Sequence, residues 1–186
     1  MTRIRGLLLS ILISGVALGA CGAASTPPTS TSPQSLPHCA SADLRVEIGV
    51  ANVAMGHVGQ QIRLKNESRS SCTLTGYPRL QMLDVAGAPI TTRLHFGSDY
   101  IVPAIPVRTV TLAPRAAAGF LVGYENATGY ATATCPTSST IEIFPPQNAT
   151  ALRVHWHLAP YGGSVNALRC GVITVSPIAR VTQLGQ

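Results

Sequence analysis

The sequence predicts an all-β domain, an immunoglobulin-like antiparallel β-sandwich of about nine short strands held by two disulfides. Three observations predict this fold. Apolar and polar residues alternate with a period of two through most of the chain after Asp43. Gly, Pro, Asn and Asp interrupt these runs at short intervals, and no stretch keeps a helical period beyond two turns.

The first two expected strands show the alternation most clearly. In DLRVEIG (43–49), Leu44, Val46 and Ile48 fall on one face and charged residues on the other. In QQIRLKN (60–66), Ile62 and Leu64 lie opposite two basic residues in the same way. Seven further runs are predicted as strands in chain order: 79–83, 90–96, 108–112, 119–124, 140–144, 151–157 and 171–175.

The N-terminus has the pattern of an export signal. Arg3 and Arg5 precede an apolar run, 7–18, which is shorter than the roughly 20 residues that a membrane-spanning helix needs. The run ends in Leu-Gly-Ala-Cys (18–21), which resembles a bacterial lipobox. The resemblance implies that residues 1–20 are removed and that Cys21 receives diacylglycerol and an acyl chain such as palmitate. The alternative is an ordinary signal peptide with an incidental cysteine.

A tether is expected between the anchor and the domain. The segment GAASTPPTSTSPQSLP (22–37) is uncharged and rich in Ser, Thr and Pro, so it cannot bury enough apolar surface to fold. We therefore divide the chain into a signal peptide (1–20), a lipidated cysteine with its tether (21–38) and a β-sandwich domain (39–186). Fully extended, the tether reaches roughly 50 Å, and as a coil about 20 to 24 Å.

The charges do not indicate a nucleic-acid partner. Thirteen Lys and Arg stand against seven Asp and Glu, but the basic residues of the domain are scattered singly. They are nearly all arginine, which together with the many alanines suggests the GC-rich genome of an actinobacterium. We expect no nucleic-acid binding.

The five cysteines divide into one anchor and two pairs. With Cys21 assigned to lipid, Cys39, Cys72, Cys135 and Cys170 form an even set in an exported domain, and their spacing fits no zinc site. Four cysteines allow three pairings, which sequence alone cannot decide between. We favour Cys39–Cys72 and Cys135–Cys170 because each closes a loop within one half of the domain.

One segment carries a family resemblance. The run KNESRSSCTLTGYPRLQMLDVAG (65–87) resembles the signature of domain-of-unknown-function family 4232, which occurs largely in actinobacterial lipoproteins, and VTLAPRAAAGFLVGY (110–124) resembles a later segment of it. Arg115 departs from the family, which commonly has glycine there. The resemblance implies a β-sandwich and no established activity. The matching residues are Asn66, Cys72-Thr73-Leu74, Gly76-Tyr77-Pro78, Leu83-Asp84 and Gly87.

Enzyme signatures are absent from the sequence. It contains no Gly-x-Ser-x-Gly elbow, no His-Glu-x-x-His, no dinucleotide fingerprint and no phosphate loop. The few acidic residues, which include Asp43, Asp84, Asp99, Glu125 and Glu142, show no pairing pattern. We expect no catalysis and no cofactor, and a hydrolase ranks third among the functions considered.

Two histidines form the sharpest local pattern. In LRVHWHL (152–158), alternation sends His155 and His157 outward about 7 Å apart and Trp156 into the core. Such a pair can bind copper or zinc when other ligands complete the shell. The simpler interpretation, two solvated histidines, is favoured because Arg153 on the same face would repel a cation. The residues that could complete a shell are His57, His95, Met55 and Met82.

The sequence thus predicts an exported, lipid-anchored cell-envelope protein on the outer face of the cytoplasmic membrane. Its expected role is non-catalytic binding or positioning of an unidentified envelope protein, glycan or lipid. The alternative is an exported metal-handling protein that uses His155 and His157. Three Asn-x-Ser/Thr patterns, at Asn66, Asn126 and Asn148, are expected to be chance in a bacterial lipoprotein.

Overall fold

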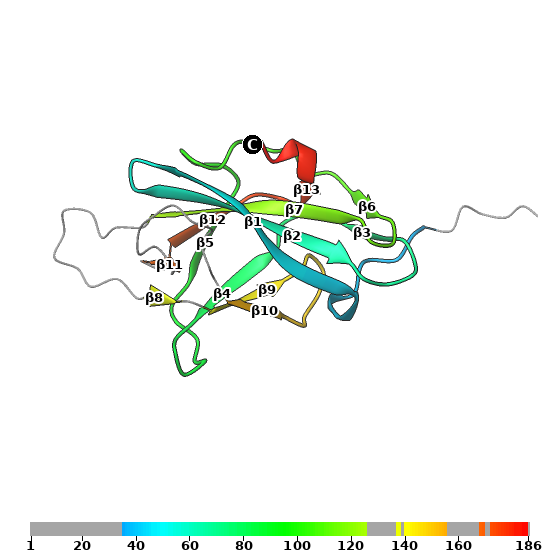
Figure 1. Cartoon of the computed structure of the whole chain (residues 1–186), viewed down its shortest axis with the longest axis horizontal. Helices are drawn as coiled ribbons and strands as arrows, with labels where there is room; N and C mark the ends of the chain where they lie inside the picture. Colours follow the sequence, from blue (N-terminus) through cyan, green and yellow to red (C-terminus); the bar gives the residue numbers. More distant parts are fainter. Residues whose placement is uncertain (1–34, 126–136, 139, 156–167, 170–171, 186) are drawn as a thin grey trace, which may run out of the picture. The chain divides into compact units, whose positions relative to one another are not determined.

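The computed structural model describes residues 35–125, 137–138, 140–155, 168–169 and 172–185, and these form an all-β domain (Figure 1). No α-helix occurs in these ranges, where two 3₁₀ turns, η1 (Ser41–Asp43) and η2 (Val181–Gln183), are the helical elements. None of the described residues forms a helix long and apolar enough to span a bilayer. The strands are β1 (Leu44–Ala54), β2 (His57–Asn66), β3 (Cys72–Leu74), β4 (Arg79–Leu83), β5 (Arg93–Phe96), β6 (Val110–Leu112), β7 (Ala117–Glu125), β8 (Thr137–Ser138), β9 (Thr140–Phe144), β10 (Leu152–His155), β11 (Leu168–Arg169), β12 (Val172–Val175) and β13 (Ala179–Arg180).

The larger sheet has six strands in the order β1-β2-β7-β12-β5, with β13 also pairing with β7. Its pairs are antiparallel except β12–β5, which is parallel. The prediction of a purely antiparallel sandwich is wrong at this pair. Alternation in the sequence specifies which face a residue occupies, but it carries no information on the direction of the neighbouring strand.

A three-stranded sheet, β10-β9-β4, faces the larger one across a shared core (Figure 1). Ile62 and Phe120 from the large sheet and Met82, Ile141 and Ile143 from the small one are fully buried in the same cluster. Two short ribbons, β3–β6 and β8–β11, complete the described structure. The arrangement is therefore sandwich-like, as the sequence predicts.

Each of the nine expected runs contains an observed strand, but four short strands (β3, β8, β11 and β13) and the outer half of the first hairpin lie outside the expected runs. β1 and β2 extend to a two-residue turn at Met55-Gly56, where both φ angles are positive, 49° and 85°. Asn-Gly is the usual signal for such a turn. Methionine gives no such signal, so the extension could not be predicted.

The β2–β7 pair is buried on both faces. Its inner face carries Ile62 and Phe120 into the main core, while Leu121 on the outer face packs in a second cluster with Val102 and Leu184. Gly59 lies directly opposite Gly123 in this pair. This glycine pair leaves the outer face flat enough for the loop after β5 to lie against it.

The loop after β5 approaches these two glycines closely. A Cβ atom on Gly123 would lie 2.6 Å from Val102 Cγ2 and 2.8 Å from Asp99 Oδ2. A Cβ on Gly59 would lie 2.9 Å from Ile101 Cγ1. These separations are well inside the usual contact distance of about 3.5 to 4.0 Å between carbon atoms, so a side chain at either position would displace the residues of the loop after β5.

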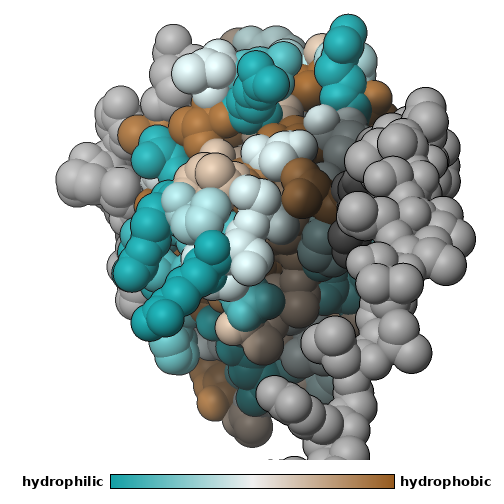
Figure 2. All heavy atoms as spheres, turned by 90° about the vertical axis from the view of Figure 1, so that its right-hand side faces the viewer, coloured by the Kyte–Doolittle hydropathy of each residue, from teal (hydrophilic) through white to brown (hydrophobic). Residues whose placement is uncertain are grey.

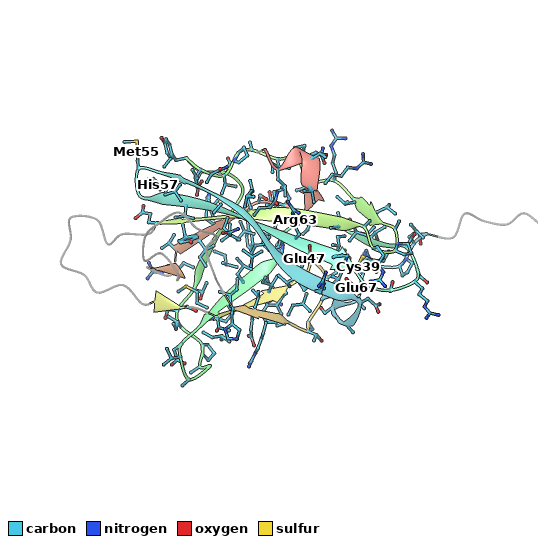
Figure 3. All side chains as sticks on the ribbon, in the orientation of Figure 1. Cys39, Glu47, Met55, His57, Arg63 and Glu67 are labelled. Carbon is cyan, nitrogen blue, oxygen red and sulfur yellow. A yellow bond between two sulfur atoms is a disulfide. The ribbon has the colours of Figure 1, made fainter. Side chains whose placement is uncertain are left out.

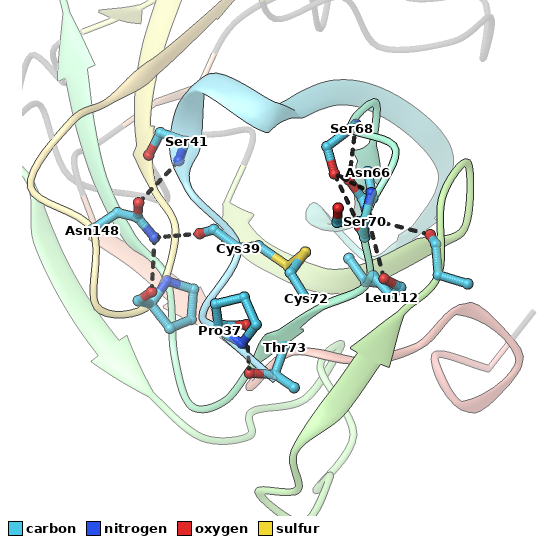
Figure 4. The surroundings of a disulfide bond; sticks show 12 residues. Pro37, Cys39, Ser41, Asn66, Ser68, Ser70, Cys72, Thr73, Leu112 and Asn148 are labelled. Carbon is cyan, nitrogen blue, oxygen red and sulfur yellow. Dashed lines mark hydrogen bonds between the residues drawn. A yellow bond between two sulfur atoms is a disulfide. The ribbon is translucent and has the colours of Figure 1, made fainter. Parts of the chain in front are cut away.

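The N-terminal end of the domain is fixed by a disulfide and by two asparagine side chains, Asn66, which is buried, and Asn148, which is half-buried (Figure 4). Cys39 and Cys72 form a disulfide, the pair that the sequence analysis favoured. Asn148 donates to Cys39 O (3.0 Å) and accepts from Ser41 N (2.9 Å). On the loop-entropy model, closing this loop stabilises the fold by about 3 to 4 kcal/mol. Cys135 and Cys170 lie outside the described residues.

Asn66 holds the β2–β3 corner. Its side chain is fully buried, donates to Ser70 O (2.8 Å) and Leu112 O (3.1 Å), and accepts from Ser68 N (3.0 Å). Its Asn-x-Ser pattern is therefore a structural motif with no accessible amide for a sugar. Asn148 is engaged in the same way, and Asn126 lies outside the described residues.

Arg115 occupies a backbone conformation that favours glycine. Its φ is 68°, which explains why the resembled family commonly has glycine at this position. The arginine is held there by a hydrogen bond from its N–H to Asn66 O (2.8 Å) and by an ion pair with Glu67. The strand that follows, β7, begins as expected, so the substitution alters the turn residue and not the fold.

Glu67 forms ion pairs with three basic side chains at the N-terminal end of the domain. Lys65 Nζ lies 3.1 Å and Arg45 Nε 3.3 Å from its carboxylate, which also pairs with Arg115. The hydrogen bond from Lys65 is the largest cause that lowers the pKa of Glu67. Desolvation raises this pKa, and the positive charges of Lys65, Arg115 and Arg45 lower it further. Because the pKa is lowered, this contact stabilises the fold at neutral pH and is lost as the pH falls through the folded-state pKa of Glu67.

Replacing Gly123 should loosen the loop over the β2–β7 pair. We expect Gly123→Ala to lower the free energy of unfolding by about 1 to 3 kcal/mol, the usual cost of overpacking, as measured by guanidinium titration. In a Val102→Ala background the same change should cost less, because the nearest clashing methyl group is gone, although Asp99 Oδ2 still lies close. Additive costs in this double-mutant cycle would contradict the proposed contact.

Candidate functional site

An open pocket lies at the end of the domain formed by the β1–β2 turn, which we call the hairpin end. Figure 3 places Met55 and His57 there, at the opposite end of the domain from Cys39 and Glu67. The pocket has a volume of about 280 Å³. It is lined by His57 from β2, Asp99 and Tyr100 from the loop after β5, Gly123, Tyr124 and Glu125 from β7, and Val172 and Thr174 from β12.

Strand register brings its residues together. His57 and Glu125 lie directly opposite each other at the ends of β2 and β7, although they are far apart in sequence. Tyr100 packs against His57, with ring centroids 5.3 Å apart at an angle of 49°, and its hydroxyl points to Met55 Sδ at 3.7 Å. Tyr100 is 67% exposed and Met55 88% exposed. The pocket therefore has an accessible aromatic wall.

Asp99 orders the loop that carries Tyr100. Its Oδ1 accepts hydrogen bonds from the backbone of Ile101 (2.8 Å) and Val102 (2.7 Å), and its own N–H donates to Val102 O (3.0 Å). This turn places the carboxylate over Gly123, where a side chain would collide with Oδ2. The glycine platform and the pocket are thus parts of one arrangement.

The pocket carries negative charge. Within the part of the chain that the structure describes, no basic side chain forms an ion pair with Asp99 or Glu125. Carboxylates beside the faces of aromatic rings suit an ammonium or guanidinium group, which gains Coulomb attraction and a cation–π contact together. The geometry accordingly fits a small cationic group.

The structure does not gather the histidines and methionines that a metal site would need. His155 is exposed on β10, with Nδ1 3.1 Å from Thr140 Oγ1, and His157 lies outside the described residues. Met82 is fully buried in the core, and His95 is exposed on β5. Across the described ranges, no group of three His, Cys, Asp or Glu residues is placed to hold a metal ion.

Arg153 is not a free cation beside His155. Arg153 was expected to repel a cation near His155, but its guanidinium donates to Glu142 Oε1 from Nε at 2.9 Å. The carboxylate of Glu142 therefore lies beside the Arg153 guanidinium on this face. Trp156, which was expected in the core, lies outside the described residues, as does Cys21.

Sequence reasoning did not find the hairpin-end pocket. His57 was considered only as a metal ligand, and Asp99 and Glu125 only as scattered acids. Tyr100 was not singled out. These residues meet through the β2–β7 register and through the crossing of the loop after β5, and neither leaves a local pattern in the sequence. The Gly97-Ser98-Asp99 run before Tyr100 indicates a turn, but not what it faces.

Tyr77 of the segment that resembles the family lies half-buried against Phe96 with ring centroids 5.3 Å apart. Other residues of the matching segment also have structural roles. Gly76 and Gly87 have positive φ angles of 99° and 84°, and Asp84 accepts two backbone hydrogen bonds in the β4 turn. The segment therefore specifies turns of the fold.

A comparison with known families agrees with the family resemblance of residues 65–87. The sequence model described as "Domain of unknown function (DUF4232)" matches residues 39–179. No curated protein and no solved structure matches the chain.

Proposed function

Since the chain belongs to the DUF4232 family, whose description carries no activity, we propose that it is a lipid-anchored binding module of the cell envelope with no catalytic step. The observation that best supports this proposal is that the N-terminal segment and the hairpin-end pocket lie at opposite ends of the domain. The segment that leads to Cys21 joins at Cys39, and the hairpin-end pocket lies at the far end of β2 (Figure 3). A strand of ten residues separates them by roughly 30 Å.

The anchor part of the proposal rests on the N-terminal sequence. The lipobox-like Leu-Gly-Ala-Cys run assigns Cys21 to lipid, and the Ser/Thr/Pro-rich tether provides reach. On this proposal the mature protein sits on the outer face of the cytoplasmic membrane. We also place the domain in the immunoglobulin-like class of sandwiches, supported by two facing sheets around one core.

The binding part rests on the chemistry of the pocket. Asp99 and Glu125 supply negative charge, and the rings of His57 and Tyr100 supply an exposed wall beside them. An envelope partner that presents a lysine-like ammonium or an arginine-like guanidinium fits this surface. A second candidate function, metal handling, gains no support from the placement of His155.

Loss of charge and of the aromatic wall should weaken cation binding. The probe is a short lysine-rich peptide titrated into the unlipidated protein by calorimetry, with a glutamate-rich peptide of equal length beside it. We expect Glu125→Gln and Tyr100→Ala each to weaken binding about fivefold to tenfold. Glu142→Gln, which removes the same charge from the other sheet, should leave the affinity unchanged. Equal binding of the two peptides, or equal effects of the variants, would contradict the proposal.

Removing the thiol of Cys21 should abolish anchoring. We expect Cys21→Ala either to keep its signal segment or to move from the detergent phase to the aqueous phase in Triton X-114 partitioning, because lipid transfer precedes cleavage at a lipobox. The folded domain should be unaffected. A Cys21→Ala protein that is processed normally and still partitions into detergent would rule out the lipid anchor.

A further inference from the structure

A second pocket, near the N-terminal end of the domain, has the opposite charge. It is an open hollow of about 500 Å³ lined by six residues of the segment before β6 and of the C-terminal segment. These are Pro106, Arg108, Thr109, Val110, Arg180 and Gln183. The segments meet here because β13 pairs with β7, while Ile178 N donates to Gly76 O beside the β3–β6 ribbon.

The two arginines of this basic pocket are exposed and carry uncompensated charge. All seven Asp and Glu residues of the chain lie in described ranges, and no side-chain carboxylate there forms an ion pair with Arg108 or Arg180. By contrast, Lys65 and Arg115 are paired with Glu67. Two guanidinium groups without an ion-pair partner therefore line one hollow, and such groups suit an oxyanion.

A hydroxyl group is also available in the basic pocket. Thr75 Oγ1 lies 2.9 Å from Thr109 Oγ1 and can donate to it, which leaves the proton of Thr109 free to face a ligand. Val110 and Pro106 add apolar atoms to the lining of the hollow. The combination of two guanidinium groups, a hydroxyl and apolar atoms suits a phosphate attached to an organic group.

The location of the basic pocket indicates where that phosphate comes from. The tether joins the domain at Pro37, whose carbonyl oxygen accepts from Thr73 N at 2.9 Å on β3, and β3 pairs with β6 immediately after Arg108 and Thr109. Figure 2 looks onto this end and shows hydrophilic residues gathered there with smaller hydrophobic patches between them. The basic pocket therefore lies at the end of the domain where the segment from Cys21 enters.

We infer that Arg108 and Arg180 bind the phosphate of anionic membrane lipid head groups, so that the domain lies on the bilayer with its N-terminal end down. The inference depends on the proposed function in one respect, because the proposed anchor brings the domain close to the membrane. The opposite charges of the two pockets reinforce the orientation, because an anionic surface attracts the pair Arg108 and Arg180 and repels Asp99 and Glu125.

The test uses the protein from Gly22 onward, without lipid, so that failure of the anchor cannot affect the result. Binding is measured by co-sedimentation with vesicles of phosphatidylcholine and with equimolar vesicles of phosphatidylcholine and phosphatidylglycerol. We expect binding to the anionic vesicles alone, and a loss on the order of tenfold or more in the Arg108→Gln, Arg180→Gln double variant. The matched control is Arg93→Gln, Arg153→Gln, which removes the same charge from β5 and β10 and should bind within about twofold of the unmodified protein.

Other outcomes overturn the inference. Equal losses in the two double variants would mean that net charge, and not the basic pocket, attracts the protein to the vesicles. Equal sedimentation with both vesicle types would exclude recognition of the anionic head group. Saturable calorimetric binding of inorganic phosphate, lost in the Arg108→Gln, Arg180→Gln variant and without vesicle binding, would assign the basic pocket to a free phosphate instead. Unchanged thermal unfolding of both variants shows that folding is intact.

Discussion

The register of β2 against β7 is the constraint on which the rest of the structure depends. Nine residue pairs, from His57 opposite Glu125 to Lys65 opposite Ala117, hold the centre of the large sheet. The inner face of this pair carries the main core, and the outer face accepts the loop after β5 because Gly59 and Gly123 oppose each other. A slip of one residue would exchange these faces and place glycines in the core.

The same register places two groups of polar and charged residues at opposite ends of the domain. At one end it places His57 and Glu125 in a pocket that Asp99 and Tyr100 complete. At the other, Lys65 joins the ion network of Glu67, close to the Asn66 corner and the Cys39–Cys72 disulfide. The ten-residue length of β2 thus places the hairpin-end pocket roughly 30 Å from the ion network of Glu67.

Much of the fold could be predicted from the sequence because alternation is a local signal. The runs around Ile62 and Phe120 predicted the centre of the core, and the cysteine spacing favoured the Cys39–Cys72 pair. The parallel β5–β12 pair and the short strands left no local pattern, since each depends on a partner distant in sequence. The Met55-Gly56 turn lacks the usual turn residue. The hairpin-end pocket escaped prediction for the same reason as the parallel pair: it exists only after the strands are in register.

The proposed orientation places the N-terminal end of the domain against the membrane and leaves the hairpin-end pocket exposed. Energy transfer to acceptor-labelled lipid head groups tests it most directly, with a donor dye attached to the lipidated protein through either Arg69→Cys or Met55→Cys. Both positions are exposed, and they lie at opposite ends of the domain. The account predicts markedly stronger transfer from position 69 than from position 55. Equal transfer from the two positions, or stronger transfer from position 55, would contradict it.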